Sequence, residues 1–253
     1  MRSDELDEKM RKGEYFHGLR VLQGTYIVVR VDGRSFSRLN ERVCEKPFDE
    51  GFHRKMTEAA KAILASLHAV YAHTQSDEIS ILLPLSSDLF DREVEKLVSI
   101  AAASGSAALS LALGEAVELD ARLWLGARRG DVVDYFRWRQ SDATRSALNN
   151  WCYWTLRKEG KSTKEATQAM IGLSVSRKNE LLFQRGINFN EVPAWQRRGS
   201  AIYWENITKI GKNPKTGESV PTLRRRLTVN DDLPMKEAYG KLVRQFLKEE
   251  ADA

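Results

Sequence analysis

The chain has 253 residues, of which 42% are hydrophobic and 30% charged, and this composition excludes a disordered protein. Forty Lys and Arg against 35 Asp and Glu give a net charge of +5, and no run of about 18 apolar residues indicates a membrane span. The charged first residues do not resemble a secretory signal, and Cys44 and Cys152 are too few for a disulfide framework or a zinc set, so we expect a cytoplasmic protein that does not contact a membrane.

Apolar residues recur at strand or helix spacing throughout the first half of the chain. The predicted elements are a strand over 26–31, a helix over 49–67, a hairpin of strands over 69–73 and 79–83, a helix over 87–113 and a strand over 121–127. This βαββαβ order is typical of the ferredoxin-like fold, and we therefore predict an α+β domain over residues 1–130.

The second half of the chain is basic and mostly helical. Its pattern predicts helices over 131–158, 162–172, 176–184 and 235–248 and strands over 201–208 and 222–229. No linker follows Gly130, so we expect residues 131–253 to pack on the first domain as an extension. Its clusters of Arg and Lys suit contacts with a phosphate backbone, although a set of solvated faces would give the same pattern.

Three carboxylates stand where the predicted topology brings two strands together. In the ferredoxin-like order the first strand lies antiparallel to the third, so Asp32, at the end of one, meets Asp77 and Glu78, at the bend before the other. Clustered carboxylates repel each other unless a cation lies between them, and oxygen ligands of this kind suit Mg²⁺. The alternative is that Asp32 and Asp77 only cap turns.

No other catalytic motif competes with these carboxylates. The sequence contains no nucleophile elbow, zinc-protease helix, P-loop or dinucleotide fingerprint. Its four histidines, His17, His53, His68 and His73, show no metal-ligand spacing. We expect the six tryptophans mainly in the core.

Four motifs occur in order along the chain: Arg30-Val-Asp-Gly-Arg-Ser-Phe36, Gln75-Ser-Asp-Glu-Ile-Ser80, Tyr135-Phe-Arg-Trp-Arg-Gln-Ser-Asp142 and Arg177-Lys-Asn-Glu-Leu-Leu-Phe183. Together they resemble the tRNA(His) guanylyltransferase superfamily of 3′–5′ polymerases, over about residues 14–230. The resemblance implies a polymerase-palm-like domain, with an extension that binds tRNA and assembles a homotetramer as a dimer of dimers.

The resemblance also implies a chemistry and its residues. Asp32, Asp77 and the Gly33 carbonyl would hold two Mg²⁺ ions, with Glu78 alongside as a third catalytic residue. ATP or GTP would activate the 5′-phosphate of tRNA, and the 3′-hydroxyl of an incoming NTP would then attack it.

Basic and polar residues complete the implied site. The matching nucleotide-binding positions are Arg30, Arg34, Lys46, Ser76, Arg92, Lys96, Lys178 and Asn179, of which Arg92 and Lys96 are expected one turn apart on the helix over 87–113. The RNA-binding candidates are Arg137, Arg139, Arg197 and Arg198.

One segment departs from the family pattern. Eukaryotic-type members carry a His-Ile-Asn-Asn-Leu-Tyr-Asn heptad, and of this only Leu148 and Asn150 remain in the stretch Thr144-Arg-Ser-Ala-Leu-Asn-Asn150. The departure favours templated repair of 5′-truncated tRNA, with addition of the extra guanosine to tRNA(His) as the alternative. An inactive RNA-binding relative and a nucleotide cyclase are the other classes considered; the retained carboxylates argue against the first and the basic second half against the second.

Overall fold

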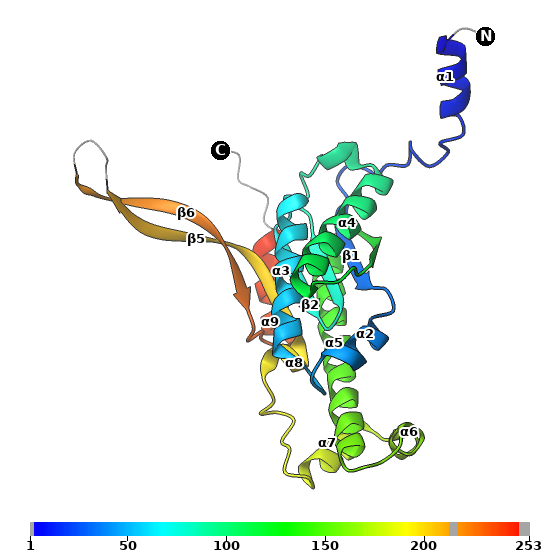
Figure 1. Ribbon diagram of the computed structural model, residues 1–253. Coiled ribbons are helices and arrows are strands. Elements are labelled where there is room, and N and C mark those ends of the chain that lie inside the picture. Colours follow the sequence, from blue (N-terminus) through cyan, green and yellow to red (C-terminus); the bar gives the residue numbers. More distant parts are fainter. Residues whose placement is uncertain (1–2, 213–216, 248–253) are drawn as a thin grey trace.

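A computed structural model describes residues 3–212 and 217–247. Its centre is a six-stranded antiparallel sheet in the order β4-β1-β3-β2-β5-β6 (Figure 1). The first four of these strands are β1 (Tyr26–Gly33), β2 (Tyr71–Gln75), β3 (Glu78–Leu82) and β4 (Leu119–Gly126). Their order, 4-1-3-2, is the ferredoxin-like arrangement, so the predicted α+β fold is confirmed.

Helices cover both faces of this sheet. On one face, α3 (Glu50–Ser66) and α4 (Val94–Leu113) pack against Val29, Val31 and their neighbours. On the other, α5 (Arg129–Lys158) and α9 (Lys236–Arg244) pack against Val28 and Leu82. The β-branched run at the start of β1 is therefore buried on both sides, which explains why it does not alternate with polar residues.

The remaining elements surround this core. They are α1 (Ser3–Arg11), α2 (Phe36–Val43), η1 (Leu89–Arg92), α6 (Thr163–Met170), α7 (Val175–Phe183), α8 (Ala194–Arg198), β5 (Ser200–Lys212), β6 (Ser219–Asn230) and η2 (Gln245–Leu247). Of these, α1, α2 and α8 were not predicted. The strands β5 and β6 are longer than predicted, and their paired ends form a ribbon that projects from the body (Figure 1). Since β5 pairs with β2, the sheet continues across residue 130.

The helix predicted over 87–113 begins later, at Val94. Phe90, Asp91 and Arg92 have φ angles of 55°, 52° and 57°, and this left-handed stretch forms most of the turn η1 that precedes α4. Arg92 is buried there, and its guanidinium donates hydrogen bonds to four backbone carbonyls, those of Val21, Leu22, Thr25 and Ser87. The expectation that Arg92 shares a helix face with Lys96 is wrong, because Arg92 precedes the helix and anchors the chain before β1.

Helix α4 departs from the expectation that no apolar segment is long enough for a membrane span. By length and composition it is apolar enough to cross a membrane. In the structure it packs on α3 and β4 through Leu97, Ala101, Gly105 and Leu109, and its outer face is largely Ala and Ser. Three of its serines form hydrogen bonds with neighbouring segments, as Ser106 does with the Leu119 amide.

Candidate active site

The carboxylates meet at one end of β1 and β3. Asp32 lies directly opposite Glu78 in the register of the two strands, and the Gly33 amide donates a hydrogen bond of 3.2 Å to the Asp77 carbonyl. The bend of the hairpin is at Ser76 and Asp77, while Glu78 is already the first residue of β3. The convergence predicted from topology is therefore present.

The local sequence explains how Asp32 faces the site. Arg30 and Asp32 alternate with the core residues Val29 and Val31, so their side chains lie on the α5 side of the sheet. The strand ends at Gly33, where a Cβ atom would lie 2.4 Å from the ring of Phe36. Glycine therefore lets the chain turn closely into α2 behind the carboxylate.

Asp32 and Asp77 form a pair of like charges. Asp77 is largely buried, and this burial raises the pKa of its carboxyl group; the charge of Asp32 raises it further, against hydrogen bonds from its own backbone and from Ser76. Such a pair is stabilised by a cation placed between its oxygens. The carboxylate oxygens of Asp32 and Asp77 are ligands of the kind that Mg²⁺ prefers.

Glu78 has a different role from this pair. Both of its carboxylate oxygens accept hydrogen bonds from Arg139, at 2.6 and 2.7 Å, and Arg30 lies 2.7 Å away. Arg30 also lies 3.4 Å from Asp32. Because two guanidinium groups occupy its oxygens, Glu78 is placed to orient Arg30 beside Asp32 rather than to bind a metal ion.

Arg139 corrects one of the RNA-binding expectations. Its side chain is 8% exposed, and it bridges Glu78 and Asp142, the latter at 3.0 Å. Burial alone would lower the pKa of Arg139, but the two carboxylates outweigh it and raise that pKa. Arg139 is therefore part of the ion pairs beside the carboxylates and not of an exposed basic surface.

Two adjoining pockets open at these carboxylates. The carboxylate pocket, of about 190 Å³, is lined by Asp32, Asp77, Glu78 and one face of α5. The aromatic pocket, of about 270 Å³, is lined by Lys46, Trp154 and Trp195 among others. Both pockets share the residues Phe48, Gln75, Ser76, Asp77 and Asn150. A ligand with a flat apolar part and an anionic part could therefore span them.

The aromatic pocket joins Lys46, expected at the nucleotide site, to aromatic residues that the sequence did not single out. The Lys46 ammonium lies 5.3 Å from the centre of the Trp154 ring, and His53 stacks on Trp195 at 4.3 Å. Both tryptophans are only partly buried, so the expectation of core tryptophans is wrong for them. Nothing in the local sequence separates them from Trp204, which packs against the core.

Other nucleotide-binding candidates lie outside both pockets. Arg34 is exposed and pairs with Glu118 at 2.7 Å. Lys178 and Asn179 lie on α7, where the Lys178 carbonyl faces Cys152 on α5. Arg92 contacts the carbonyl of Thr25, just before β1, which is seven residues or roughly 20 Å of extended strand from Asp32. The structure therefore does not bring Arg92 to the carboxylates. Lys96, in the first turn of α4, pairs with Glu93 next to Arg92 and is not brought to them either.

The remaining RNA-binding candidates are partly tied to the protein. Arg137 lies 3.6 Å from Asp134. Arg197 and Arg198 donate hydrogen bonds to the backbone carbonyls of Val192 and Leu233, at 2.6 and 2.7 Å. A role in RNA binding stays a prediction for these three.

His73, in the wall of the carboxylate pocket, gives the fold a pH dependence. Burial lowers the pKa of its imidazole to about 4 from the ordinary 6.5, and its Nε2 donates to the Arg198 carbonyl at 2.9 Å. A base with a lowered folded-state pKa stabilises the fold above 6.5 and loses that contribution as the pH falls toward 4. We expect this group to cost up to about 3 kcal/mol of unfolding free energy over that interval. Urea titrations of His73→Gln should show a flatter pH dependence; an unchanged slope would contradict the assignment.

Comparison with known proteins places this chain in a family. The family model described as tRNAHis guanylyltransferase matches residues 7–132, and that of the Thg1 C-terminal domain matches residues 130–238. A probable tRNA(His) guanylyltransferase from Dictyostelium discoideum is 33% identical over 87% of this chain and 90% of its own length. The chain belongs to the tRNA(His) guanylyltransferase family.

Members of the tRNA(His) guanylyltransferase family differ in length. The chain is 30% and 32% identical to tRNA(His) guanylyltransferases 1 and 2 of Arabidopsis thaliana, over 81% and 79% of its residues, but spans only 38% and 39% of their lengths. The tRNA(His) guanylyltransferase of Saccharomyces cerevisiae superposes with a TM-score of 0.70 and 26% identity, over 76% of this chain and 91% of that one.

A bacterial relative shares the whole fold. A bacterial tRNA(His) guanylyltransferase-like protein in complex with ATP superposes with a TM-score of 0.73, over 96% of this chain and 99% of that one, at 24% identity. The likeness extends through α5 and the β5–β6 hairpin as well as the ferredoxin-like core.

Proposed function

We propose that the chain transfers a nucleotide to the 5′ end of tRNA at the Asp32–Asp77 pair. The observation that carries the proposal is the juxtaposition of two carboxylates, one of them largely buried, with a pocket next to them. Membership of the tRNA(His) guanylyltransferase family supports tRNA as the acceptor. The reaction joins the 3′-hydroxyl of an NTP to an activated 5′-phosphate and releases the activating group.

Mg²⁺ is the cofactor that these residues suit. Asp32, Asp77 and the Gly33 carbonyl would hold it, and it would supply Lewis-acid activation and neutralise charge on the reacting phosphates. Arg30, oriented by Glu78, places a further positive charge beside Asp32. Positioning and charge neutralisation are most of what phosphoryl transfer requires.

The aromatic pocket suits the base of a nucleoside triphosphate. The Trp154 and Trp195 rings offer flat apolar surfaces. Lys46 adds a cation to the same pocket, whose lining also includes Asp77. Solved structures of a bacterial tRNA(His) guanylyltransferase-like protein are complexes with ATP and with GTP, which supports a nucleotide as the ligand of this chain.

Addition of the extra guanosine to tRNA(His) is the task we propose first. Relatives that carry this name are about one-third identical along most of the chain. The templated repair favoured by the Thr144–Asn150 departure is the second candidate. The observation in its favour is that this departure lies at the carboxylate pocket, which Ser146, Ala147 and Asn150 line.

The identity of the base opposite the added nucleotide separates these two tasks. The substrates are 5′-monophosphorylated tRNAs that present C, G, A or U at that position, each incubated with ATP and the four NTPs. Guanosine addition to tRNA(His) whatever base lies opposite supports the first candidate. Addition that follows Watson–Crick pairing in every tRNA supports the second.

Removing the Trp154 ring is expected to weaken use of the NTP. Stacking of a base on an aromatic ring contributes about 1–3 kcal/mol, so Trp154→Ala should raise the KM for the NTP by about tenfold or more. Trp154→Phe should recover part of the loss, since it keeps a flat ring. Steady-state kinetics with varied NTP checks this; an unchanged KM in Trp154→Ala would place the base elsewhere.

A further inference from the structure

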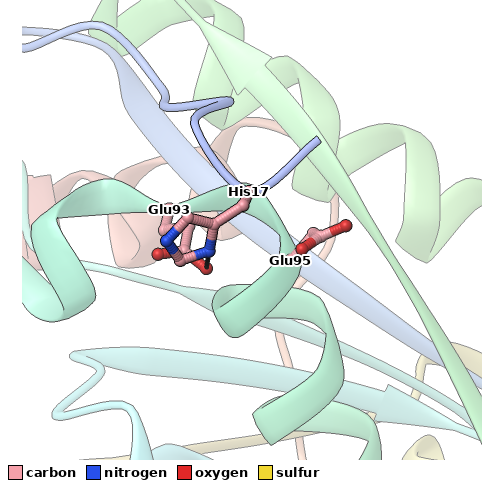
Figure 2. Close-up of side chains that lie close together, drawn as sticks. All are labelled: His17, Glu93 and Glu95. Carbon is pink, nitrogen blue, oxygen red and sulfur yellow. Dashed lines mark ion pairs between the residues drawn. The ribbon is translucent and has the colours of Figure 1, made fainter. Parts of the chain in front are cut away.

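A second group of possible metal ligands lies at the opposite end of β1 from Asp32 and Asp77. Figure 2 shows His17, from the segment before β1, beside Glu93 and Glu95 at the start of α4. One ligand atom from each of the three lies within 4.8 Å of the other two. His17 and Glu93 are 76 positions apart, so no local motif could reveal the group.

The backbone holds the two segments of this cluster together. An isolated β-bridge joins Arg20 to Glu93, and the amides of Val21 and Val94 donate to the carbonyls of Arg92 and Leu19, at 3.0 and 2.9 Å. The buried Arg92 side chain adds its four bonds, three of them to the same N-terminal segment. The cluster is thus supported on both sides by fixed backbone.

Glu93 gives the reason to expect a ligand here. Its side chain is 4% exposed, and its carboxylate makes two long ion pairs within the described residues. The nearest cationic atoms are Nδ1 of His17 and Nζ of Lys96, each 3.6 Å from a carboxylate oxygen, which is beyond hydrogen-bond distance. Ion pairs of this length offset only part of the cost of burying a carboxylate, and a cation bound directly to its oxygens would offset more of it.

The ligand types and their spacing select the cation. Two ligands of a tetrahedral zinc ion lie roughly 3.4 Å apart, because each bond is about 2.0–2.2 Å long. The separation of 3.6 Å between His17 Nδ1 and Glu93 Oε1 is close to this value. An imidazole with two carboxylates suits Zn²⁺ and related transition ions, whereas Mg²⁺ prefers oxygen ligands alone.

We propose that His17, Glu93 and Glu95 bind one Zn²⁺ ion, which fastens the segment before β1 to the start of α4. The three side chains leave a fourth position for water. Lys96 competes for Glu93 in the metal-free protein, and because its side chain is half-exposed it can turn to solvent when the ion binds. The site differs from the Asp32–Asp77 pair in ligand chemistry and lies at the other end of the strand.

Calorimetric titration of the full chain with Zn²⁺, in excess Mg²⁺, tests this assignment. The wild type should bind one Zn²⁺ per chain at this site, and His17→Ala should weaken that binding at least about tenfold. The exposed His68 provides the matched control, and His68→Ala should bind as the wild type does. Equal Zn²⁺ affinity in the wild type and His17→Ala would overturn the proposal, because any remaining site would then lie elsewhere.

Two further measurements distinguish a built site from a weak surface contact. Lys96→Met removes the competing cation and should tighten Zn²⁺ binding, whereas a contact that does not involve Glu93 would be unaffected. Zn²⁺ should raise the Tm of the wild type but not that of His17→Ala, because the ion stabilises only the fold that presents all three ligands. Equal rises in Tm would contradict the proposal.

Discussion

An Asp77→Asn variant is expected to lose nucleotide addition by at least about a thousandfold. The substitution keeps the size of the side chain but removes the charge that, with Asp32, would hold Mg²⁺. Gel analysis of tRNA extension checks the loss. Asp120→Asn is the matched control, since Asp120 lies opposite Asp32 on β4, is exposed and pairs with Arg122. A similar loss in both variants would show that nucleotide addition requires negative charge along this part of the sheet, and not the Asp32–Asp77 pair in particular.

The same variant should not be less stable in metal-free buffer. The raised pKa of Asp77 means that the fold favours its protonated form, so the charged form destabilises the protein once the pH exceeds that pKa. At pH 7 Asp77→Asn removes this cost, and its Tm in EDTA should equal or exceed that of the wild type. A clear fall in Tm would show that Asp77 is a structural carboxylate.

An Arg139→Met variant is expected to lose about 3 kcal/mol of unfolding free energy. It leaves Glu78 buried with Arg30 alone and removes the contact with Asp142. Arg145→Ala is the control, because Arg145 also contacts Asp142 but is exposed, and such a pair contributes about 0–1 kcal/mol. Urea denaturation measures both. Unchanged stability together with weaker tRNA binding would restore the RNA-binding role first expected of Arg139.

Much of the fold follows from short-range patterns in the sequence. The apolar run at 26–31 and the paired runs at 69–73 and 79–83 predict the central strands, and the βαββαβ order then determines that β1 lies beside β3. The convergence of Asp32 with Asp77 and Glu78 follows from this order. The strand order places the three residues at the same end of β1 and β3, and the alternation of apolar residues with the short turn then sets the register.

The roles of individual arginines could not be predicted in the same way. Arg92 and Arg139 are charged residues in basic or helical segments, and the usual expectation is a solvated or ligand-facing cation. Their burial depends on partners that are distant in the sequence, the carbonyls before β1 for Arg92 and Glu78 for Arg139. The aromatic pocket is assembled in the same way, from Lys46, Trp154 and Trp195 on three separate segments.

The most direct test is extension of 5′-monophosphorylated tRNA(His) that lacks its extra nucleotide, with ATP, GTP and Mg²⁺. We expect the wild type to give a product one nucleotide longer at the 5′ end. Omission of Mg²⁺ or the Asp77→Asn substitution should abolish that product, while Asp120→Asn should retain it. Extension by Asp77→Asn at the wild-type rate, or no extension of any tRNA by the folded wild type, would contradict the assignment of the Asp32–Asp77 pair as a nucleotidyl-transfer site.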